Sequence, residues 1–329
     1  MLTKRQNFIE TIKGGNPDRF VNQFEFLSMV PNPIRNQCPP PAYGGEPKYD
    51  IWGVLKAFPL GTPGPFPVHT EEHIVIKDID NWRDYLKFPN TKISDAEWEP
   101  VIAAAEAIDR NETYCTVTAI PGVFEQTHYL LEIQRALMAF YESPDEMKEL
   151  IDVITDYEMA LAEEYCTRIK PDALFKHDDW GSQISTFLSP DMFEEFYLDS
   201  YKKIYGYYKS HGVEIIVHHS DSYAATYVPF MIDMGMDVWQ GVMNTNDIPS
   251  LIEKYGGQIA FMGGIDSATV DYEGWTEDIV REQVRKACDA CGTKYFIPCG
   301  SQGGAMSTFP GVYEAISKEI DDYSKIIFK

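Results

Sequence analysis

A regular alternation of strand-like and helix-like segments is the feature of this sequence that most restricts its fold. Short runs rich in β-branched and aromatic residues are separated by longer segments whose apolar residues recur with a period of 3.6. Runs such as Ile215-Ile216-Val217 are continuously apolar, which is typical of parallel strands covered on both faces. The predicted strands are residues 20–26, 114–119, 172–177, 214–219, 237–241, 258–263 and 294–299.

The predicted helices lie between these strands. Two of them begin with a Ser-Pro pair, Ser143-Pro144 and Ser189-Pro190, which places proline at the first helical position. The helices are residues 3–12, 95–110, 123–142, 144–169, 190–211, 222–234, 247–255, 276–291 and 310–323.

Strands that alternate with helices over short connections form a parallel sheet with right-handed crossovers. A (β/α)8 TIM barrel and an open doubly wound sheet both fit this order. No glycine-rich phosphate-binding turn follows a strand, which disfavours the dinucleotide-binding version of the open sheet. We therefore predict a (β/α)8 TIM barrel, a single domain over residues 1–329, whose eighth strand lies near residues 73–79 or is absent.

A proline-rich segment, residues 27–72, interrupts the alternation. Its prolines exclude regular structure over most of the span, and a long ordered loop in a compact domain is usually functional. We therefore predict a Pro-rich N-terminal insertion that covers a pocket, with Tyr43, Trp52 and Phe58 as its aromatic contacts. The prolines are Pro31, Pro33, Pro39, Pro40, Pro41, Pro47, Pro59, Pro63, Pro65 and Pro67.

Charge and composition exclude several classes of partner. The 329 residues include 51 acidic and 28 basic side chains, a formal net charge of −23, whereas nucleic-acid binding needs clustered Lys and Arg. No run approaches the ~20 apolar residues of a transmembrane helix, and the N-terminus lacks the apolar region of a signal peptide. We therefore expect a cytoplasmic protein that binds neither nucleic acid nor membrane, with its six cysteines reduced.

Side chains that could carry chemistry recur where the predicted strands end. In barrel enzymes the reacting groups lie just beyond the carboxyl ends of the strands. Any single one of these residues could equally be a solvated polar residue, but their recurrence at strand after strand favours a site. The residues are Glu25, His177, Asp178, Asp179, Trp180, His218, His219, Asp221, Gln240, Asp266 and Cys299.

A candidate metal site combines His219, Asp221 and Cys299. Residues two apart leave a strand on the same face, so His219 and Asp221 can converge on one ion. Cys299 follows a distant strand that lies near this point in a closed barrel. One imidazole, one carboxylate and one thiolate suit Zn²⁺ and leave an open position for chemistry. The alternative is that His219 is a hydrogen-bonded core histidine and Cys299 a small buried residue.

Short motifs over nearly the whole chain carry a family resemblance. They are Asn16-Pro17-Asp18-Arg19, Asp178-Asp179-Trp180-Gly181, Ser189-Pro190, His219-Ser220-Asp221, Gly264-Ile265-Asp266 and Pro298-Cys299-Gly300. Together they resemble the uroporphyrinogen decarboxylase superfamily and, within it, the corrinoid-dependent methyltransferases, in particular the O-demethylase methyltransferase I.

The resemblance implies a (β/α)8 barrel with a zinc site. The methyltransferase branch has a His-x-Cys pair after one strand and a further Cys after the last strand. His219 and Cys299 match this pattern, and Asp221 stands where the middle cysteine would be. Asp221 is therefore the least certain of the three ligands.

The true decarboxylases resemble the chain less. They recognise a porphyrinogen with many carboxylates partly through an Arg-rich segment at the first strand, where this chain reads Asn22-Gln23-Phe24-Glu25. An acidic residue at that place, in a chain of net charge −23, would repel a polycarboxylate. A decarboxylase-like lyase is therefore a weak alternative.

The replacement of cysteine by Asp221 favours one methyltransferase role over the other. Thiol-methylating enzymes use thiolate-rich zinc to hold the acceptor sulfur, whereas a carboxylate ligand leaves zinc a stronger Lewis acid toward oxygen. The resemblance thus implies O-demethylation, in which a methyl group passes from a methoxylated aromatic compound to the Co(I) cobalamin of a separate corrinoid protein. The alternatives are a methylcobalamin:thiol methyltransferase and a binding protein without turnover.

The roles implied for individual residues divide into two groups. The acids that could stabilise a departing phenolate are Asp178, Glu25 and Asp179. The substrate-binding candidates are Phe24, Trp180, Trp239 and Asp266.

Overall fold

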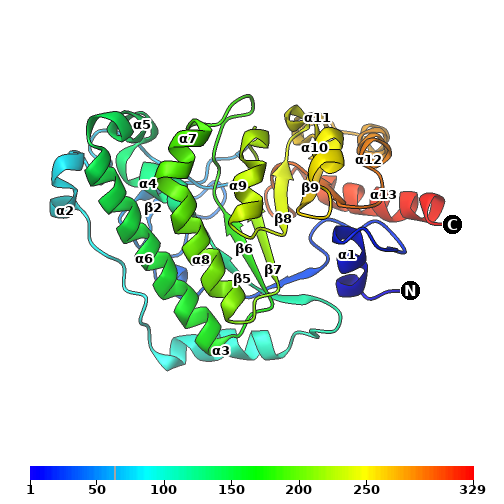
Figure 1. Ribbon diagram of the computed structural model, residues 1–329, viewed down its shortest axis with the longest axis horizontal. Helices are drawn as coiled ribbons and strands as arrows, with labels where there is room; N and C mark the ends of the chain where they lie inside the picture. The colour runs from blue at the N-terminus through cyan, green and yellow to red at the C-terminus, as the bar shows by residue number, and fades with distance from the viewer. Residues whose placement is uncertain (63) are drawn as a thin grey trace.

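The computed structural model of the chain describes residues 1–62 and 64–329 and shows an α/β fold built on a parallel sheet (Figure 1). Every strand of this sheet runs parallel to its neighbours. The parallel sheet predicted from the alternation is confirmed, and all its predicted strands except the first lie within two residues of the observed ones. In spatial order the strands are β1 (Leu27–Met29), β5 (Tyr114–Ala119), β6 (Ala173–His177), β7 (Ile215–His219), β8 (Val238–Val242), β9 (Ala260–Ile265) and β10 (Phe296–Gly300).

The predicted first strand is wrong, and the eighth strand is not found at the place suggested for it. Residues 20–22 have no regular structure and residues 23–26 form a turn, in which Gln23 has a φ of +49° and the Glu25 N–H donates to the carbonyl of Asn22. The short strand β1 begins only after them. Residues 73–79 contain no strand, so of the two alternatives for the eighth strand its absence fits: the part of the chain that the structure describes has seven strands in the main sheet.

The sheet is curled around an apolar interior. Successive side chains of a strand point to opposite faces, and Phe175 of β6 and Val217 of β7 belong to one buried cluster. Ile297 of β10 and Leu27 of β1, which lie on opposite edge strands, pack in the same cluster. Phe8, from helix α1 (Lys4–Ile12), also joins it. Since both edges share one interior, the fold is barrel-like.

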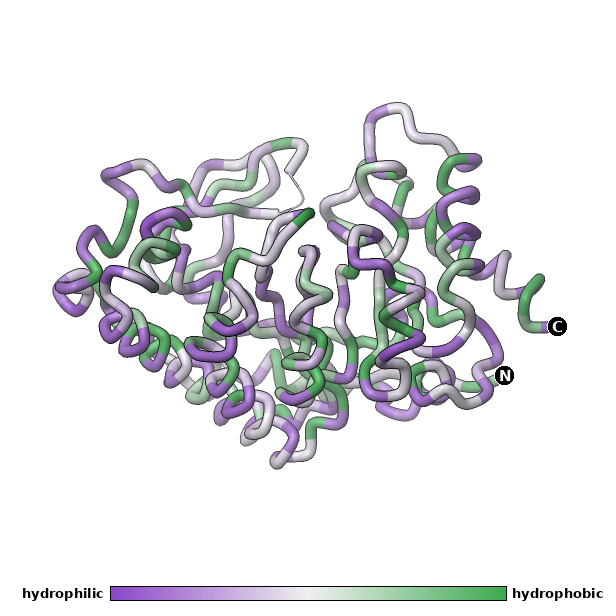
Figure 2. The backbone as a smooth tube through the Cα atoms, turned by 45° about the horizontal axis from the view of Figure 1, so that its top comes forward, coloured by the Kyte–Doolittle hydropathy of each residue, from purple (hydrophilic) through white to green (hydrophobic). Residues whose placement is uncertain are grey.

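Helices cover the outer face of the sheet. Figure 1 shows α6 (Pro144–Arg168) and α8 (Asp199–Ser210) side by side next to the strands, and Figure 2 shows hydrophilic segments at the outer turns. None of the described helices combines the length and the apolar character needed to cross a membrane. The helices after α1 are α2 (Trp82–Tyr85), α3 (Asp95–Glu106), α4 (Val123–Leu131), α5 (Ile133–Glu142), α6 (Pro144–Arg168), α7 (Pro190–Phe193), α8 (Asp199–Ser210), α9 (Val228–Asp233), α10 (Ile248–Tyr255), α11 (Ser267–Val270), α12 (Glu277–Cys291) and α13 (Val312–Ile327).

The predicted helix 123–142 is divided in two. Glu132 has a φ of +74°, which a helix cannot continue, and its carboxylate accepts the backbone N–H groups of Gln134 and Arg135 at the start of α5. Glu125 and Tyr129 of α4 line the cavity described below, whereas none of its described lining residues belongs to α5.

The proline-rich segment is more regular than predicted. It contains β1 and a separate three-stranded antiparallel sheet made of β2 (Lys48–Tyr49), β3 (Leu55–Ala57) and β4 (Phe66–Pro67). Trp52 is buried, with its ring 4.9 Å from that of Tyr157 on α6. This contact anchors the segment to the helical layer, and β3 and β4 reach the cavity. Pro63 lies outside the described residues.

Candidate functional site

A cavity of about 410 Å³ lies at the carboxyl ends of the strands. Its wall combines apolar rings, two basic side chains and several acids. The lining residues are Phe24, Arg35, Lys56, Gly64, Pro65, Phe66, Ile120, Pro121, Glu125, Tyr129, Phe175, His177, Asp179, His219, Asp221, Gln240, Gln302, Gly303 and Ser307. Ligand pockets of this size and composition hold small molecules.

Strand register assembles the floor of the cavity. His177 on β6 pairs with His219 on β7, and His219 pairs with Gln240 on β8, so the three side chains form one layer. The layer lies directly above the apolar layer that contains Phe175 and Val217. Because side chains alternate along a strand, the polar layer faces the same interior as the apolar one.

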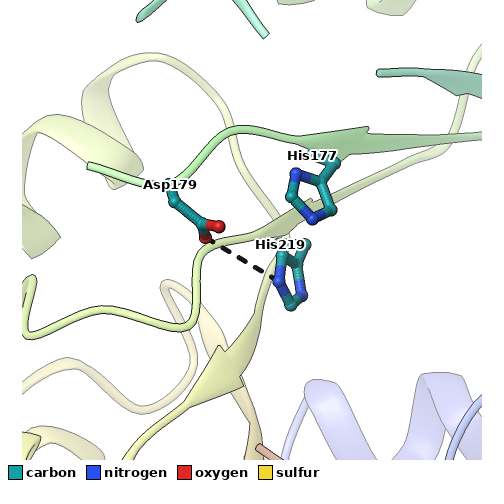
Figure 3. Close-up of side chains that lie close together, drawn as sticks. All are labelled: His177, Asp179 and His219. Carbon is teal, nitrogen blue, oxygen red and sulfur yellow. Dashed lines mark ion pairs between the residues drawn. The ribbon is translucent and has the colours of Figure 1, made fainter. Parts of the chain in front are cut away.

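Three side chains of this floor could hold a metal ion. The ligand atoms of His177, Asp179 and His219 all lie within 4.8 Å of one another (Figure 3). His219 Nε2 lies 3.7 Å from a carboxylate oxygen of Asp179 and 3.8 Å from one of Asp221. Two imidazoles and a carboxylate, with a second carboxylate beside them, are a donor set that zinc accepts in catalytic sites.

Each imidazole of the cluster is oriented by a hydrogen bond on the far side of its ring. His177 Nδ1 lies 2.9 Å from Glu125 Oε2, and His219 Nδ1 bonds the side-chain oxygen of Gln240. The Nε2 atom of each ring is therefore the one left to face an ion. Metal-binding histidines characteristically have such a partner, which fixes the tautomer and the ring orientation.

The electrostatics of the cluster also fit a cation. Burial and the neighbouring Asp179 raise the pKa of Asp221 to about 8, and burial raises the pKa of Asp179 to about 6 although His177 opposes this. Burial and the charge on His177 lower the pKa of His219 to about 3, which keeps its imidazole neutral and able to ligate. Carboxylates crowded in this way are stabilised by a positive ion between them.

His177 carries the compensating charge in the protein alone. Burial disfavours the imidazolium, but the carboxylates of Glu125 and Asp179 outweigh this effect and raise the pKa of His177 to about 10. Since a metal ion binds the neutral ring, metal binding at this site would release a proton.

Asp178, predicted as a catalytic acid, is fully buried and is not among the residues that line the cavity. Its carboxylate accepts the backbone N–H groups of Phe124 (3.1 Å) and Glu125 (2.8 Å) at the start of α4, together with the hydroxyl of Tyr201. A side chain at Gly122 would overlap this carboxylate, so glycine is required there. Asp178 thereby fixes the helix that presents Glu125 to His177.

Of the other residues predicted to bind substrate or to act in catalysis, one lines the cavity and four lie outside its wall. Phe24, predicted to bind substrate, lines the cavity. Trp180 and Trp239 are fully buried outside the cavity wall, where their indole N–H groups donate to Tyr201 and to the carbonyl of Ser220. Asp266 caps α11 by accepting the N–H of Ala268, and Glu25 accepts the N–H of Asn22. The structure brings none of the last four into the cavity wall.

Cys299 lies below the cavity floor. Its Sγ atom is 4.0 Å from Gln240 Nε2 and 3.9 Å from Gln23 Oε1, and burial raises its thiol pKa to about 12. The Gln240 side chain therefore lies between this thiol and His219. In the described structure Cys299 is not among the three residues whose ligand atoms converge.

The sequence places His177 among the strand-end candidates without a role, and it does not indicate its partner Glu125. The signal that would select His177 is the alternation of side chains along the strand. Phe175, His177 and Asp179 occupy alternate positions and line the cavity, whereas Lys176, Asp178 and Trp180 do not. Glu125 lies on a helix, and no strand pattern points to it. Arg35 and Lys56 come from the proline-rich segment, whose path the sequence does not predict.

Replacing Glu125 with glutamine is expected to weaken metal binding about 10- to 100-fold. The substitution keeps the shape but removes the carboxylate that orients His177, and this is the usual range for losing such a partner. Metal affinity by competition with a chelator is the measurement. Glu142→Gln, an exposed position at the end of α5, is the matched control and should leave the affinity unchanged.

Comparison with known proteins gives a family and a fold. A family model described as "Uroporphyrinogen decarboxylase (URO-D)" matches residues 61–309. A methyltransferase from Methanosarcina mazei superposes with a TM-score of 0.66 at 14% identity, covering 98% of this chain and 99% of that one. A B12-independent methionine synthase from Shewanella sp. W3-18-1 gives 0.42 at 15% identity, covering 65% of this chain and 62% of that one. No curated protein matches the sequence.

Proposed function

Because the chain belongs to the uroporphyrinogen decarboxylase family, we propose that it is a methyltransferase of that family which demethylates a methoxylated aromatic compound. The methyl acceptor in this proposal is the Co(I) corrinoid of a separate protein. The observation that carries the proposal is the convergence of His177, Asp179 and His219 at the floor of a cavity with aromatic walls. The similar fold of a methyltransferase supports the same reaction class.

Decarboxylation of a porphyrinogen fits this cavity less well. A polycarboxylate would meet the carboxylates of Glu125 and Asp179 in the wall, and the repulsion of like charges inside a partly buried site is strong. Among the described lining residues the positive side chains are Arg35, Lys56 and the imidazolium of His177, and the last is already paired with Glu125. A one-ring compound can use the apolar wall without bringing several carboxylates to the acids.

The ligand atoms of the site favour a particular metal ion and a particular role for it in the reaction. His177, Asp179 and His219 would hold a divalent cation, zinc in this proposal, with Asp221 beside them. When bound, this ion supplies Lewis acidity toward the ether oxygen of the substrate. Nitrogen and oxygen donors favour that role over the holding of a thiolate, which is why O-demethylation is preferred to thiol methylation.

The side chains of the cavity would bind the arene and orient the two imidazoles. Phe24, Phe66 and Phe175 supply apolar surface for the arene, while Glu125 and Gln240 hold the two imidazoles. Positioning the methyl carbon for in-line attack makes the transfer effectively unimolecular, which can contribute several kcal/mol.

The reaction balances as a methyl-cation transfer. The electron pair of Co(I) forms the bond to the methyl carbon, and the pair of the C–O bond leaves with the phenolate oxygen, which takes a proton. Cobalt is oxidised from Co(I) to Co(III). No additional oxidant or reductant is consumed.

Replacing Cys299 with alanine is expected to leave the metal content near one ion per chain. The alternative ligand set predicted from the sequence, His219, Asp221 and Cys299, requires the Gln240 side chain to move from between imidazole and thiol. Elemental analysis of the purified variant decides between the two sets. Loss of the metal in Cys299→Ala would establish the thiol as a ligand and overturn the three-residue set above.

The proposed function is tested with purified protein, zinc and a Co(I) corrinoid protein. A panel of methoxyarenes is incubated with these components, and the phenol product and the methylated corrinoid are quantified. Equal amounts of both products, dependent on zinc and on the enzyme, support the proposal. Methylation of a small thiol from methylcobalamin, with no turnover of any methoxyarene, would favour the thiol methyltransferase.

A further inference from the structure

A tyrosine in the cavity wall bonds the carboxylate that orients His177. Tyr129 lies one turn after Glu125 on α4 and lines the cavity beside it. Its hydroxyl donates to Glu125 Oε1 at 3.0 Å, and Glu125 Oε2 lies 2.9 Å from His177 Nδ1. Both oxygens of the Glu125 carboxylate are therefore engaged by side chains. Tyr129 and Glu125 are buried, so little water competes with these bonds.

The second bond restricts the rotation of the carboxylate. The last torsion of a glutamate side chain is soft, and a bond to one oxygen alone leaves it free to turn. With Tyr129 on one oxygen and His177 on the other, the plane of the Glu125 carboxylate is fixed, and the direction of the His177 ring is fixed with it. The Tyr129 hydroxyl forms no other hydrogen bond among the described residues. Its polar contact there is therefore with the residue that orients the imidazole.

The proline-rich segment holds the Tyr129 side chain and backbone in place. Lys56 on β3 lies with its Nζ atom 4.6 Å from the centre of the Tyr129 ring, which is a cation–π geometry. Lys56 is itself buried, and Asp50 pairs with its ammonium at 3.1 Å. His69, further along the segment, lies with its Nε2 atom 3.0 Å from the carbonyl oxygen of Tyr129. Two contacts from the segment thus fix the residue that bonds Glu125.

We propose that Tyr129 is a positioning residue of the metal centre and that Lys56 couples it to the proline-rich segment. The hydroxyl of Tyr129 holds Glu125, and Glu125 holds the ring of His177, whose Nε2 atom faces the ion. The segment is then part of the scaffold of the metal centre as well as a wall of the cavity. This inference rests on the metal site of the proposed function and does not require the methyl transfer.

Replacing Tyr129 with phenylalanine is expected to weaken zinc binding about tenfold, which is the low end of the range for losing an outer partner of a ligand. Competition with a chelator measures the affinity. The visible absorption spectrum of Co²⁺, bound in place of zinc, reports the geometry of its ligands and should change in Tyr129→Phe. Tyr208→Phe on α8 is the matched control, because Tyr208 is buried and its hydroxyl has no hydrogen-bond partner in the described structure. The control should keep both the affinity and the spectrum.

A double-variant cycle separates positioning from a general loss of structure. If Tyr129 acts through Glu125, adding Tyr129→Phe to Glu125→Ala should cause no further loss of zinc affinity. The same loss with and without the Glu125 carboxylate would overturn the proposal. So would a Tyr129→Phe protein with the zinc affinity and the Co²⁺ spectrum of the wild type. Melting curves recorded without metal confirm that each variant is folded.

Lys56→Met tests the link to the proline-rich segment. Losing the cation over the Tyr129 ring should weaken zinc binding about threefold. Lys56→Arg should restore the wild-type affinity, because arginine keeps the charge over the ring and the pairing with Asp50. Wild-type affinity in Lys56→Met, or an equal loss in Lys56→Arg, would overturn the coupling to the segment.

The positioning role and the methyltransferase reaction fail in different ways. Zinc affinity and the Co²⁺ spectrum are measured without a methoxyarene or a corrinoid protein, so their dependence on Tyr129 supports the positioning role even where no methyl group is transferred. Methyl transfer by the wild type, together with unchanged zinc affinity and an unchanged Co²⁺ spectrum in Tyr129→Phe, overturns the positioning role and leaves the methyltransferase in place.

Discussion

Replacement of His219 by alanine is expected to abolish stoichiometric metal binding and to lower methyl transfer at least about 100- to 1000-fold. His219 contributes its Nε2 atom to the centre of the cluster, 3.7 Å from Asp179 and 3.8 Å from Asp221. Removing one electrostatic stabiliser of a developing oxyanion typically costs 10²–10³ in rate, and here the ion itself would be lost. Metal analysis and the rate of phenol formation are the measurements.

His211→Ala is the matched control for this prediction. His211 is an exposed residue just after α8, where its ring stacks on Tyr207. Metal content and rate should be unchanged in the control, and both variants should melt cooperatively. A His219→Ala protein that keeps one metal ion per chain and its activity would show that the cluster of His177, Asp179 and His219 is not the metal centre.

Breaking the buried ion pair between Lys176 and Glu158 is expected to destabilise the fold by about 3–5 kcal/mol. Lys176 on β6 is fully buried and lies 2.7 Å from Glu158 on α6, which is 3% exposed at its side chain. Lys176→Met leaves the carboxylate inside the protein without its partner. Because Lys176 precedes His177, the loss would also disturb the strand that carries the site. Urea denaturation followed by circular dichroism measures the effect.

The double variant Lys176→Met with Glu158→Leu separates charge burial from packing. If the cost comes from an unpaired charge, removing both partners should restore most of the lost stability, since apolar replacements of buried pairs are often neutral. A double variant as unstable as Lys176→Met alone would place the cost in packing instead.

The sequence predicts the parallel sheet well because its strands are buried on both faces. Each strand from β5 to β10 is a short, mainly apolar run between helices with clear periodicity. Such a run can be identified as a buried strand from its own residues, without knowing which strands it pairs with. The segment 20–26 mixes apolar residues with Asn22, Gln23 and Glu25, and it contains a left-handed turn at Gln23. Nothing in residue type alone distinguishes such a turn from a short strand.

The part of the candidate site that lies on strands can be predicted from the alternation of side chains along each strand. Asp179, His219 and Asp221 follow the inward positions Phe175 and Val217 by even steps, and the structure places all three in the cavity wall. Odd steps turn the side chain away from the cavity. Asp178, Trp180 and Trp239 stand at such positions, so they are buried outside the cavity wall.

The remaining site residues depend on tertiary geometry that the sequence does not encode locally. Glu125 reaches His177 because Asp178 holds the start of α4 and Glu132 breaks the helix after it. Cys299 is separated from His219 by the side chain of Gln240, which only the packed interior reveals. Both outcomes result from how helices and strands meet, not from spacing along the chain.

The most direct test of the methyltransferase account follows the methyl group and the ether oxygen by isotope labelling. A methoxyarene with ¹³C in its methyl carbon and ¹⁸O in its methoxy oxygen is incubated with the zinc-loaded protein and a Co(I) corrinoid protein, and products are analysed by mass spectrometry. The account predicts ¹³C on the corrinoid cobalt and full retention of ¹⁸O in the phenol. Release of ¹³C as methanol or formaldehyde, or a phenol whose oxygen comes from water, would contradict it.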